Sequence, residues 1–152
     1  MKNNFFIYIN HSEETNIPLD YKYWFFLIDY FIKSADFIEF HIWNDEVEII
    51  EELSLKTDLE RVSLYPIKMV CFRGDIHQKL TDYILNESLN QLGNIKWFSV
   101  FLKQNGNLIY ESSHWGSEIN IESPDKNEIE IIKNVLPKNA TFHDFNKKQS
   151  DY

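Results

Sequence analysis

The sequence has few glycines and a single cysteine. Its four glycines, at positions 74, 93, 106 and 116, are dispersed. This excludes a P-loop or a dinucleotide-binding loop, because both need clustered glycines for close approach to phosphates. The one cysteine, Cys71, excludes an internal disulfide, which is typical of proteins from a reducing compartment. Cys71 lies in an apolar run, residues 67–72, so we expect a buried structural thiol and not a nucleophile, which needs an electropositive and partly exposed setting.

Long apolar runs and an excess of positive charge are also missing. The longest early apolar run, residues 23–28, is far shorter than the ~18 residues that indicate a membrane span. The apolar run within residues 1–10 is too short for a secretory signal. The net charge of −9 disfavours nucleic acid and anionic membranes as partners, because both bind clustered Lys and Arg. We therefore expect a cytoplasmic protein whose partner is neither nucleic acid nor a membrane.

The order of predicted elements indicates an α+β fold. At 152 residues the chain has the length of one domain. Apolar alternation predicts strands, 3.6-residue periodicity predicts helices, and Asn105-Gly106 predicts a tight type I′ hairpin. We expect a single domain over residues 1–145, with a mainly antiparallel sheet and about three helices, and a polar tail at 146–152. The predicted strands are 5–9, 37–43, 61–65, 67–72, two within 96–114, and 140–145, and the predicted helices are 20–33, one between 75 and 93, and 123–136.

Capping residues suggest where two of these helices begin. Asp75 and Gln78 have the spacing of a capping box, and Ser123 with Pro124 suits a cap followed by the first helical residue. The connection from residue 72 to residue 96, which contains the first of these helices, could pair two strands in parallel.

The segment at residues 45–53 fits two local structures. An Asn44-Asp45 turn would make it the second strand of a hairpin with residues 37–43, with matching apolar faces. Apolar residues every three positions from Val47 would instead share one face of a helix. We favour the hairpin.

The histidines show no metal-binding spacing such as H-x-x-x-H. Glu39 and His41 share one strand face, which predicts a solvent-facing ion pair, although the two could also supply half a metal site. Ser113-His114 has no identifiable third member of a triad. We therefore expect no catalytic residues, no cofactor and no metal centre.

Acidic residues are concentrated in residues 45–60, where Lys56 is the only basic residue, and Arg61 follows directly. Carboxylates this close repel each other, so the segment is either a docking surface for a basic protein partner or a solvated face. We take it as a candidate binding surface. Its members are Asp45, Glu46, Glu48, Glu51, Glu52, Asp58 and Glu60.

A second candidate surface comes from the predicted hairpin. Counting outward from Asn105-Gly106 places Phe101 opposite Tyr110, and Trp97 opposite His114. This gives one face with aromatics around the small hydroxyls of Ser99 and Ser112. We consider Trp97, Tyr110 and His114 as partner-binding residues, and the alternative is that this face belongs to the core.

With its small size, acidic charge, α+β pattern and lack of catalytic motifs, the chain resembles the immunity proteins of bacterial polymorphic and contact-dependent toxin systems. The resemblance is one of class, covers the whole chain, and assigns a role to no single residue. It implies a cytoplasmic, non-catalytic protein that neutralises a toxin, such as a nuclease, by tight binding. The competing classes are a small enzyme with a site near Cys71 or the Trp97–His114 face, and a regulatory or adaptor subunit.

Overall fold

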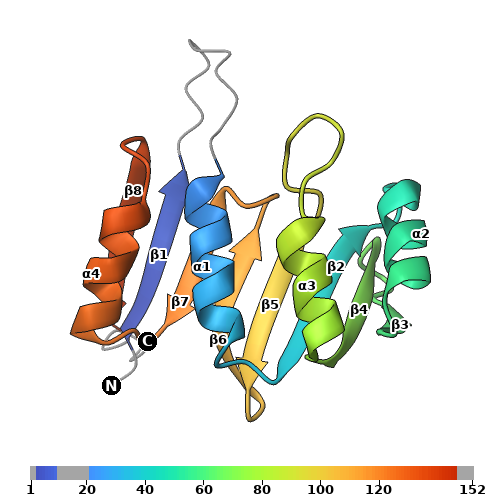
Figure 1. The fold of residues 1–152 in the computed structure, drawn as a ribbon, viewed down its shortest axis with the longest axis horizontal. Coiled ribbons are helices and arrows are strands. Elements are labelled where there is room, and N and C mark those ends of the chain that lie inside the picture. The colour runs from blue at the N-terminus through green and yellow to red at the C-terminus, as the bar shows by residue number, and fades with distance from the viewer. Residues whose placement is uncertain (1–2, 10–20, 147–152) are drawn as a thin grey trace.

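A computed structural model of the chain describes residues 3–9 and 21–146 (Figure 1). Within them, eight strands form one antiparallel sheet in the order β3-β4-β2-β5-β6-β7-β1-β8. This confirms a single α+β domain with an antiparallel sheet, although the described residues form four helices and not three. The elements are β1 (Asn3–Ile9), α1 (Lys22–Ile32), β2 (Phe37–Trp43), α2 (Val47–Lys56), β3 (Glu60–Ser63), β4 (Met69–Asp75), α3 (Gln78–Asn86), β5 (Ser99–Gln104), β6 (Asn107–Ser113), β7 (Glu118–Glu122), α4 (Lys126–Val135) and β8 (Ala140–Asn146).

The helices cover one face of the sheet, as Figure 1 shows for α1, α3 and α4. Burial alternates along β2, so that Ile38, Phe40 and Ile42 lie in the core beneath the helices. Glu39 and His41 therefore point to the opposite face. We call this the open face, because no helix of the described residues lies on it.

The hairpin at Asn105-Gly106 is confirmed. Both residues have positive φ, 50° and 80°, which a type I′ turn requires. Its predicted register is wrong, because a β-bulge between Leu102 and Lys103 shifts the pairing, and Tyr110 lies opposite Leu102 instead of Phe101. The expected aromatic–serine face therefore does not exist as predicted.

The hairpin predicted for residues 45–53 is also wrong, and the helix that was its alternative forms instead. Ile50 and Leu53, three residues apart, are both buried in α2. Residues three apart share one face of a helix, whereas in a strand they point to opposite faces. Val47, whose alternation with residue 49 suggested a strand, is 54% exposed.

The connection from β4 through α3 to β5 makes no parallel pair. β4 and β5 run in the same direction, but β2 lies between them and pairs antiparallel with each. Neither predicted cap is used: His77 caps α3 through its ring nitrogen, and Asp125 with Glu128 forms a capping box at α4. Asp75, the predicted cap of α3, is still part of β4, so α3 starts later than the capping-box spacing predicted.

The first residue of the helix predicted at residues 20–33 and the tail after residue 146 lie outside the described residues. Among the helices that are described, none has the length and apolar character needed to cross a membrane.

Candidate functional site

Four side chains distant in sequence meet at one end of the sheet. We call them the aromatic cluster: Trp43, Phe98, His114 and Trp115. Phe98 is central, with its ring centroid 5.1 Å from that of Trp43, 4.8 Å from Trp115 and 5.1 Å from His114. They meet because β2, β5 and β6 are antiparallel neighbours. The last residue of β2, the first of β5 and the last of β6 therefore lie at the same end of the sheet.

The turn from β6 to β7 holds Trp115 in an unusual backbone conformation. His114, Trp115 and Gly116 have φ values of 51°, 54° and 86°, three consecutive left-handed residues. For His and Trp this conformation costs of order 1–3 kcal/mol each, and it persists only where surrounding contacts impose it. Trp115 N–H donates to the carbonyl of Phe98, and Tyr23 Oη donates to the carbonyl of Gly116 at 2.5 Å. As a result the Trp115 side chain remains 39% exposed beside Phe98.

Glu46 connects this turn to α2. Its Oε1 accepts a hydrogen bond from Trp115 Nε1 at 3.1 Å. Its Oε2 is buried and has no hydrogen-bond partner among the residues that the structure describes. Burial raises the pKa of the Glu46 carboxyl above its ordinary value, and the Trp115 hydrogen bond opposes this only in part. A partly buried carboxylate with an unsatisfied oxygen is costly to folding and marks a place where a ligand could supply a donor.

Three of the predicted acids are exposed and follow one another at spacings of three residues, and we call them the acidic stripe: Asp45, Glu48 and Glu51. Asp45 lies just before α2, and the three-residue spacing of Glu48 and Glu51 places these two along one side of the helix. None makes an ion pair or side-chain hydrogen bond with another described residue. The row starts beside the aromatic cluster, because Asp45 directly precedes Glu46.

The remaining predicted acids have partners within the protein. Glu52 pairs with the buried Lys96 and accepts a hydrogen bond from Tyr83 Oη at 2.7 Å. The other two lie in exposed pairs, Asp58 with His77 at 3.0 Å and Glu60 with Arg73 at 3.2 Å. Glu52 and Glu60 are therefore partly neutralised by cationic partners, and Asp58 is held by a hydrogen bond with His77.

Trp97 and Tyr110 lie in the core and not on a surface. Both are 0% exposed. Trp97 packs against the rings of Trp24, Phe40 and Tyr83, and Tyr110 stacks on Phe31. His114, the third residue predicted from the hairpin, is exposed in the aromatic cluster and its Nδ1 lies 2.8 Å from Glu118. Of the residues predicted from sequence, the structure thus brings Glu46 and His114 to the same site.

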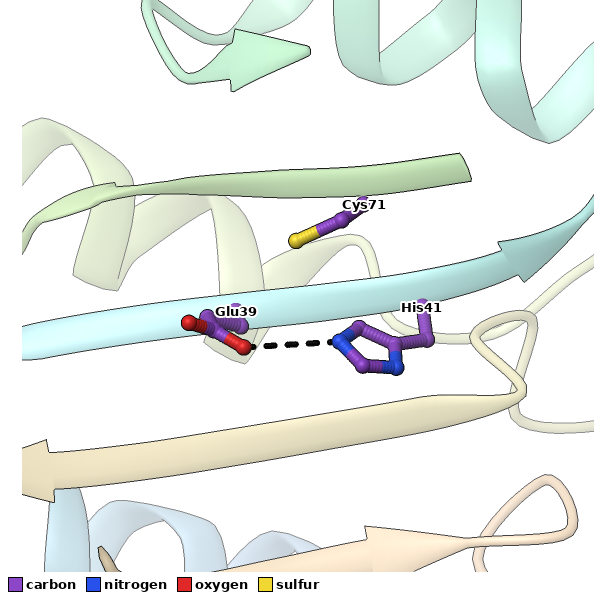
Figure 2. A group of neighbouring side chains, drawn as sticks. All are labelled: Glu39, His41 and Cys71. Carbon is purple, nitrogen blue, oxygen red and sulfur yellow. Dashed lines mark hydrogen bonds and ion pairs between the residues drawn. The ribbon is translucent and has the colours of Figure 1, made fainter. Parts of the chain in front are cut away.

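A separate group of polar side chains lies on the open face, over β2 and β4 (Figure 2). His41 is directly opposite Cys71 in the sheet, and Glu39 is two residues before His41. His41 Nε2 lies 3.4 Å from Glu39 Oε2, and Lys103 Nζ lies 3.1 Å from Glu39 Oε1. Cys71 is buried as expected, at 3% exposed.

The electrostatics of this group do not favour a nucleophilic thiol. Burial raises the pKa of Cys71 to about 11, and the negative charge of Glu39 adds to the effect. Burial also lowers the pKa of His41, against the pull of Glu39. Burial would raise the pKa of Glu39, but the hydrogen bond and charge of Lys103 outweigh it and leave that pKa below its ordinary value. At neutral pH the group is a thiol, a neutral imidazole and a carboxylate, and the thiolate needed for attack is scarce.

Comparison with known proteins finds no match among protein-family profiles, curated proteins or solved structures. What the aromatic cluster and the acidic stripe bind must therefore be inferred from their own chemistry. Sequence reasoning missed Trp43, Phe98 and Trp115, because their proximity depends on strand order. The one local signal was Trp115 next to Gly116, an aromatic residue beside a turn residue.

Proposed function

We propose that this protein acts by binding a protein partner, through the aromatic cluster and the acidic stripe, and not by catalysis. The observation that carries the proposal is the position of Trp115. A strained turn holds its ring partly exposed, against Phe98 and hydrogen-bonded to Glu46. Tryptophan is among the residues most often found at the energetic centre of protein interfaces.

The surroundings of Trp115 resemble those of an interface anchor. The ring is fixed on one side by Phe98 and on its polar edge by Glu46. A side chain that is already held in place loses little conformational entropy when a partner covers it. Backbone strain of this kind clusters at functional sites, and here it places a partly exposed tryptophan at the surface.

Charge supports a basic partner. The acidic stripe lies beside the aromatic cluster, and the whole chain carries a net charge of −9. Complementary fields accelerate encounter and reject partners of the wrong charge. We propose that the partner is a bacterial toxin domain such as a nuclease, whose substrate-binding surface must itself be basic to hold a phosphate backbone. The protein would then be an immunity protein that covers this surface.

The proposal can be tested with the product of the reading frame next to this gene in the source DNA. If that product is toxic, co-expression of this protein should restore growth, and the two proteins should co-purify. Trp115→Ala should lose protection, whereas Phe26→Ala should keep it. Phe26 is the matched control because it is an aromatic residue of similar exposure, 43%, on α1. Failure of the wild type to bind would overturn the function, and full protection by Trp115→Ala would overturn the site.

A further inference from the structure

We propose that Glu39, His41 and Cys71 form a binding site for a transition-metal ion of the Zn²⁺ class on the open face. One ligand atom from each residue, a carboxylate oxygen, an imidazole nitrogen and the thiol sulfur, lies within 4.8 Å of the other two. Nothing in the proposed partner-binding function requires this site.

The geometry follows from the register of the sheet. His41 and Cys71 are directly opposite each other on β2 and β4, and Glu39 lies next to His41 on the same face of β2. Figure 2 shows the Cys71 side chain pointing from β4 toward β2, where the Glu39 carboxylate and the imidazole of His41 lie. A tetrahedral zinc site, with metal–ligand distances of about 2.0–2.3 Å, needs its ligand atoms about 3.3–3.6 Å apart. The three atoms lie within 4.8 Å of one another, so metal binding would require side-chain rotations that bring them closer together.

The orientation of the imidazole favours a metal over a catalytic triad. In a Cys–His–acid triad the acid holds one ring nitrogen and the thiol uses the other. Here Nε2 is the nitrogen that faces Glu39 Oε2, at 3.4 Å, and in Figure 2 the thiol of Cys71 lies on that same side of the ring. Three potential ligands thus converge on one point instead of forming a chain.

The surroundings supply the outer contacts that metal ligands usually have. Lys103 Nζ binds Glu39 Oε1, which orients the carboxylate and leaves Oε2 for a metal. The ring of Phe101 packs 4.5 Å from that of His41 and restricts its rotation. The open face leaves the fourth position to water, or to a group from another molecule.

The ligand set selects the type of metal. Thiolate, imidazole and carboxylate together suit Zn²⁺, whereas Mg²⁺ and Ca²⁺ prefer oxygen ligands alone. On binding, the Cys71 thiol loses its proton to solvent and the sulfur bonds to the metal. The two negative ligands, thiolate and carboxylate, then balance the two positive charges of the ion, so that the ion and its three ligands together carry no net charge.

Cobalt substitution tests the site directly. The full-length protein is titrated with Co²⁺, which reports a thiolate ligand by a near-ultraviolet charge-transfer band and tetrahedral geometry by visible absorption. We expect one Co²⁺ per chain with both features, displaced by one equivalent of Zn²⁺. Absence of the charge-transfer band in the wild type would overturn the proposal, whatever the variants do.

Variants then assign the ligands. Cys71→Ser, His41→Ala and Glu39→Gln should each weaken Zn²⁺ binding by about 10- to 100-fold or more. His143→Ala, an exposed histidine on β8 at the other edge of the sheet, is the control and should bind like the wild type. Circular dichroism confirms that each variant is folded, and the Zn²⁺-induced rise in melting temperature should be present only in the wild type and the control. Equal affinity in Cys71→Ser, or equal loss in His143→Ala, would show adventitious binding and overturn the site.

Discussion

The indole Nε1 of Trp115 donates a hydrogen bond to Glu46 Oε1 at 3.1 Å, and so joins the β6–β7 turn to the start of α2 across 69 positions of sequence. The bond links the exposed aromatic residue of the proposed interface to the acidic segment predicted from sequence. It also leaves the second oxygen of Glu46 buried and unsatisfied within the described part of the chain.

Glu46→Gln should make the protein more stable at neutral pH and weaken partner binding. Because burial raises the pKa of Glu46, its negative charge opposes folding at any pH above the folded-state pKa. The amide removes that charge and its oxygen still accepts from Trp115. We expect a gain below about 1 kcal/mol, since the group is partly solvated. Urea denaturation should show this gain shrink as the pH falls through the raised pKa, and vanish below the ordinary value of 4.5. A loss of stability at pH 7 would contradict this account.

Gly116→Ala should destabilise the protein more than Gly93→Ala. Both glycines have positive φ, 86° and 80°, so an alanine at either position costs roughly 1–2 kcal/mol in backbone strain. At Gly116 the new Cβ would also lie 3.0 Å from Trp24 Cδ1 and 3.2 Å from Ile95 Cγ1, whereas at Gly93 it meets nothing within 4 Å. The excess of about 1–3 kcal/mol at Gly116 therefore measures the close packing that supports the turn. Equal destabilisation of the two variants in urea would show that the turn is not held by this packing.

Glu52→Gln should be strongly destabilising, by about 3 kcal/mol or more, because it leaves the charge of the buried Lys96 without its carboxylate partner. Glu51→Gln, an exposed neighbour on the same helix, should change stability little. The stability that this pair gives the wild type should also depend on pH. Burial would raise the pKa of Glu52, but Lys96 and Tyr83 outweigh it and lower that pKa, so the stabilisation is complete above the unfolded value of 4.5 and is lost as pH falls through the folded value. Chemical denaturation from pH 7 to pH 3 measures this, and a variant as stable as the wild type would contradict it.

Charge reversal in the acidic stripe should slow association with a basic partner. Glu48→Lys and Glu51→Lys each change an exposed side chain, so folding should be nearly unaffected. The loss in association rate should shrink as salt rises, because ions screen the long-range field. Glu130→Lys on α4 makes the same charge change near the opposite edge of the sheet and serves as the control (Figure 1). An equal effect at Glu130 would mean that net charge matters and the stripe does not.

Local signals in the sequence were sufficient for much of the fold. Asn105-Gly106 predicted its hairpin because both residues tolerate positive φ, and the alternation along β2 predicted a half-buried strand. Residues 45–53 were ambiguous, since apolar residues two apart and three apart both occur there. The helix forms because it buries both Ile50 and Leu53 in the core. That burial depends on core residues from the rest of the chain, which the local sequence does not specify.

The sites were less predictable, because they depend on contacts between distant strands. The acidic segment was visible in the sequence, but which carboxylates remain free was not, since Lys96, His77 and Arg73 come from elsewhere. One β-bulge between Leu102 and Lys103 shifts the register of β5 with β6, so that Tyr110 lies opposite Leu102 and is buried in the core. The proximity of Cys71 to His41 likewise follows from the register of β2 with β4, which no local pattern specifies.

The most direct test of the proposed function is the dissociation rate of Trp115→Ala from the partner encoded beside this gene. Truncation of an interface anchor typically costs about 2 kcal/mol or more, which corresponds to about 30-fold in Kd and appears mainly in dissociation. We predict this loss at both low and high salt, with Phe26→Ala unchanged, and circular dichroism at the temperature of the binding assay should show that Trp115→Ala is folded. A Trp115→Ala protein that folds and dissociates as slowly as the wild type would contradict the account.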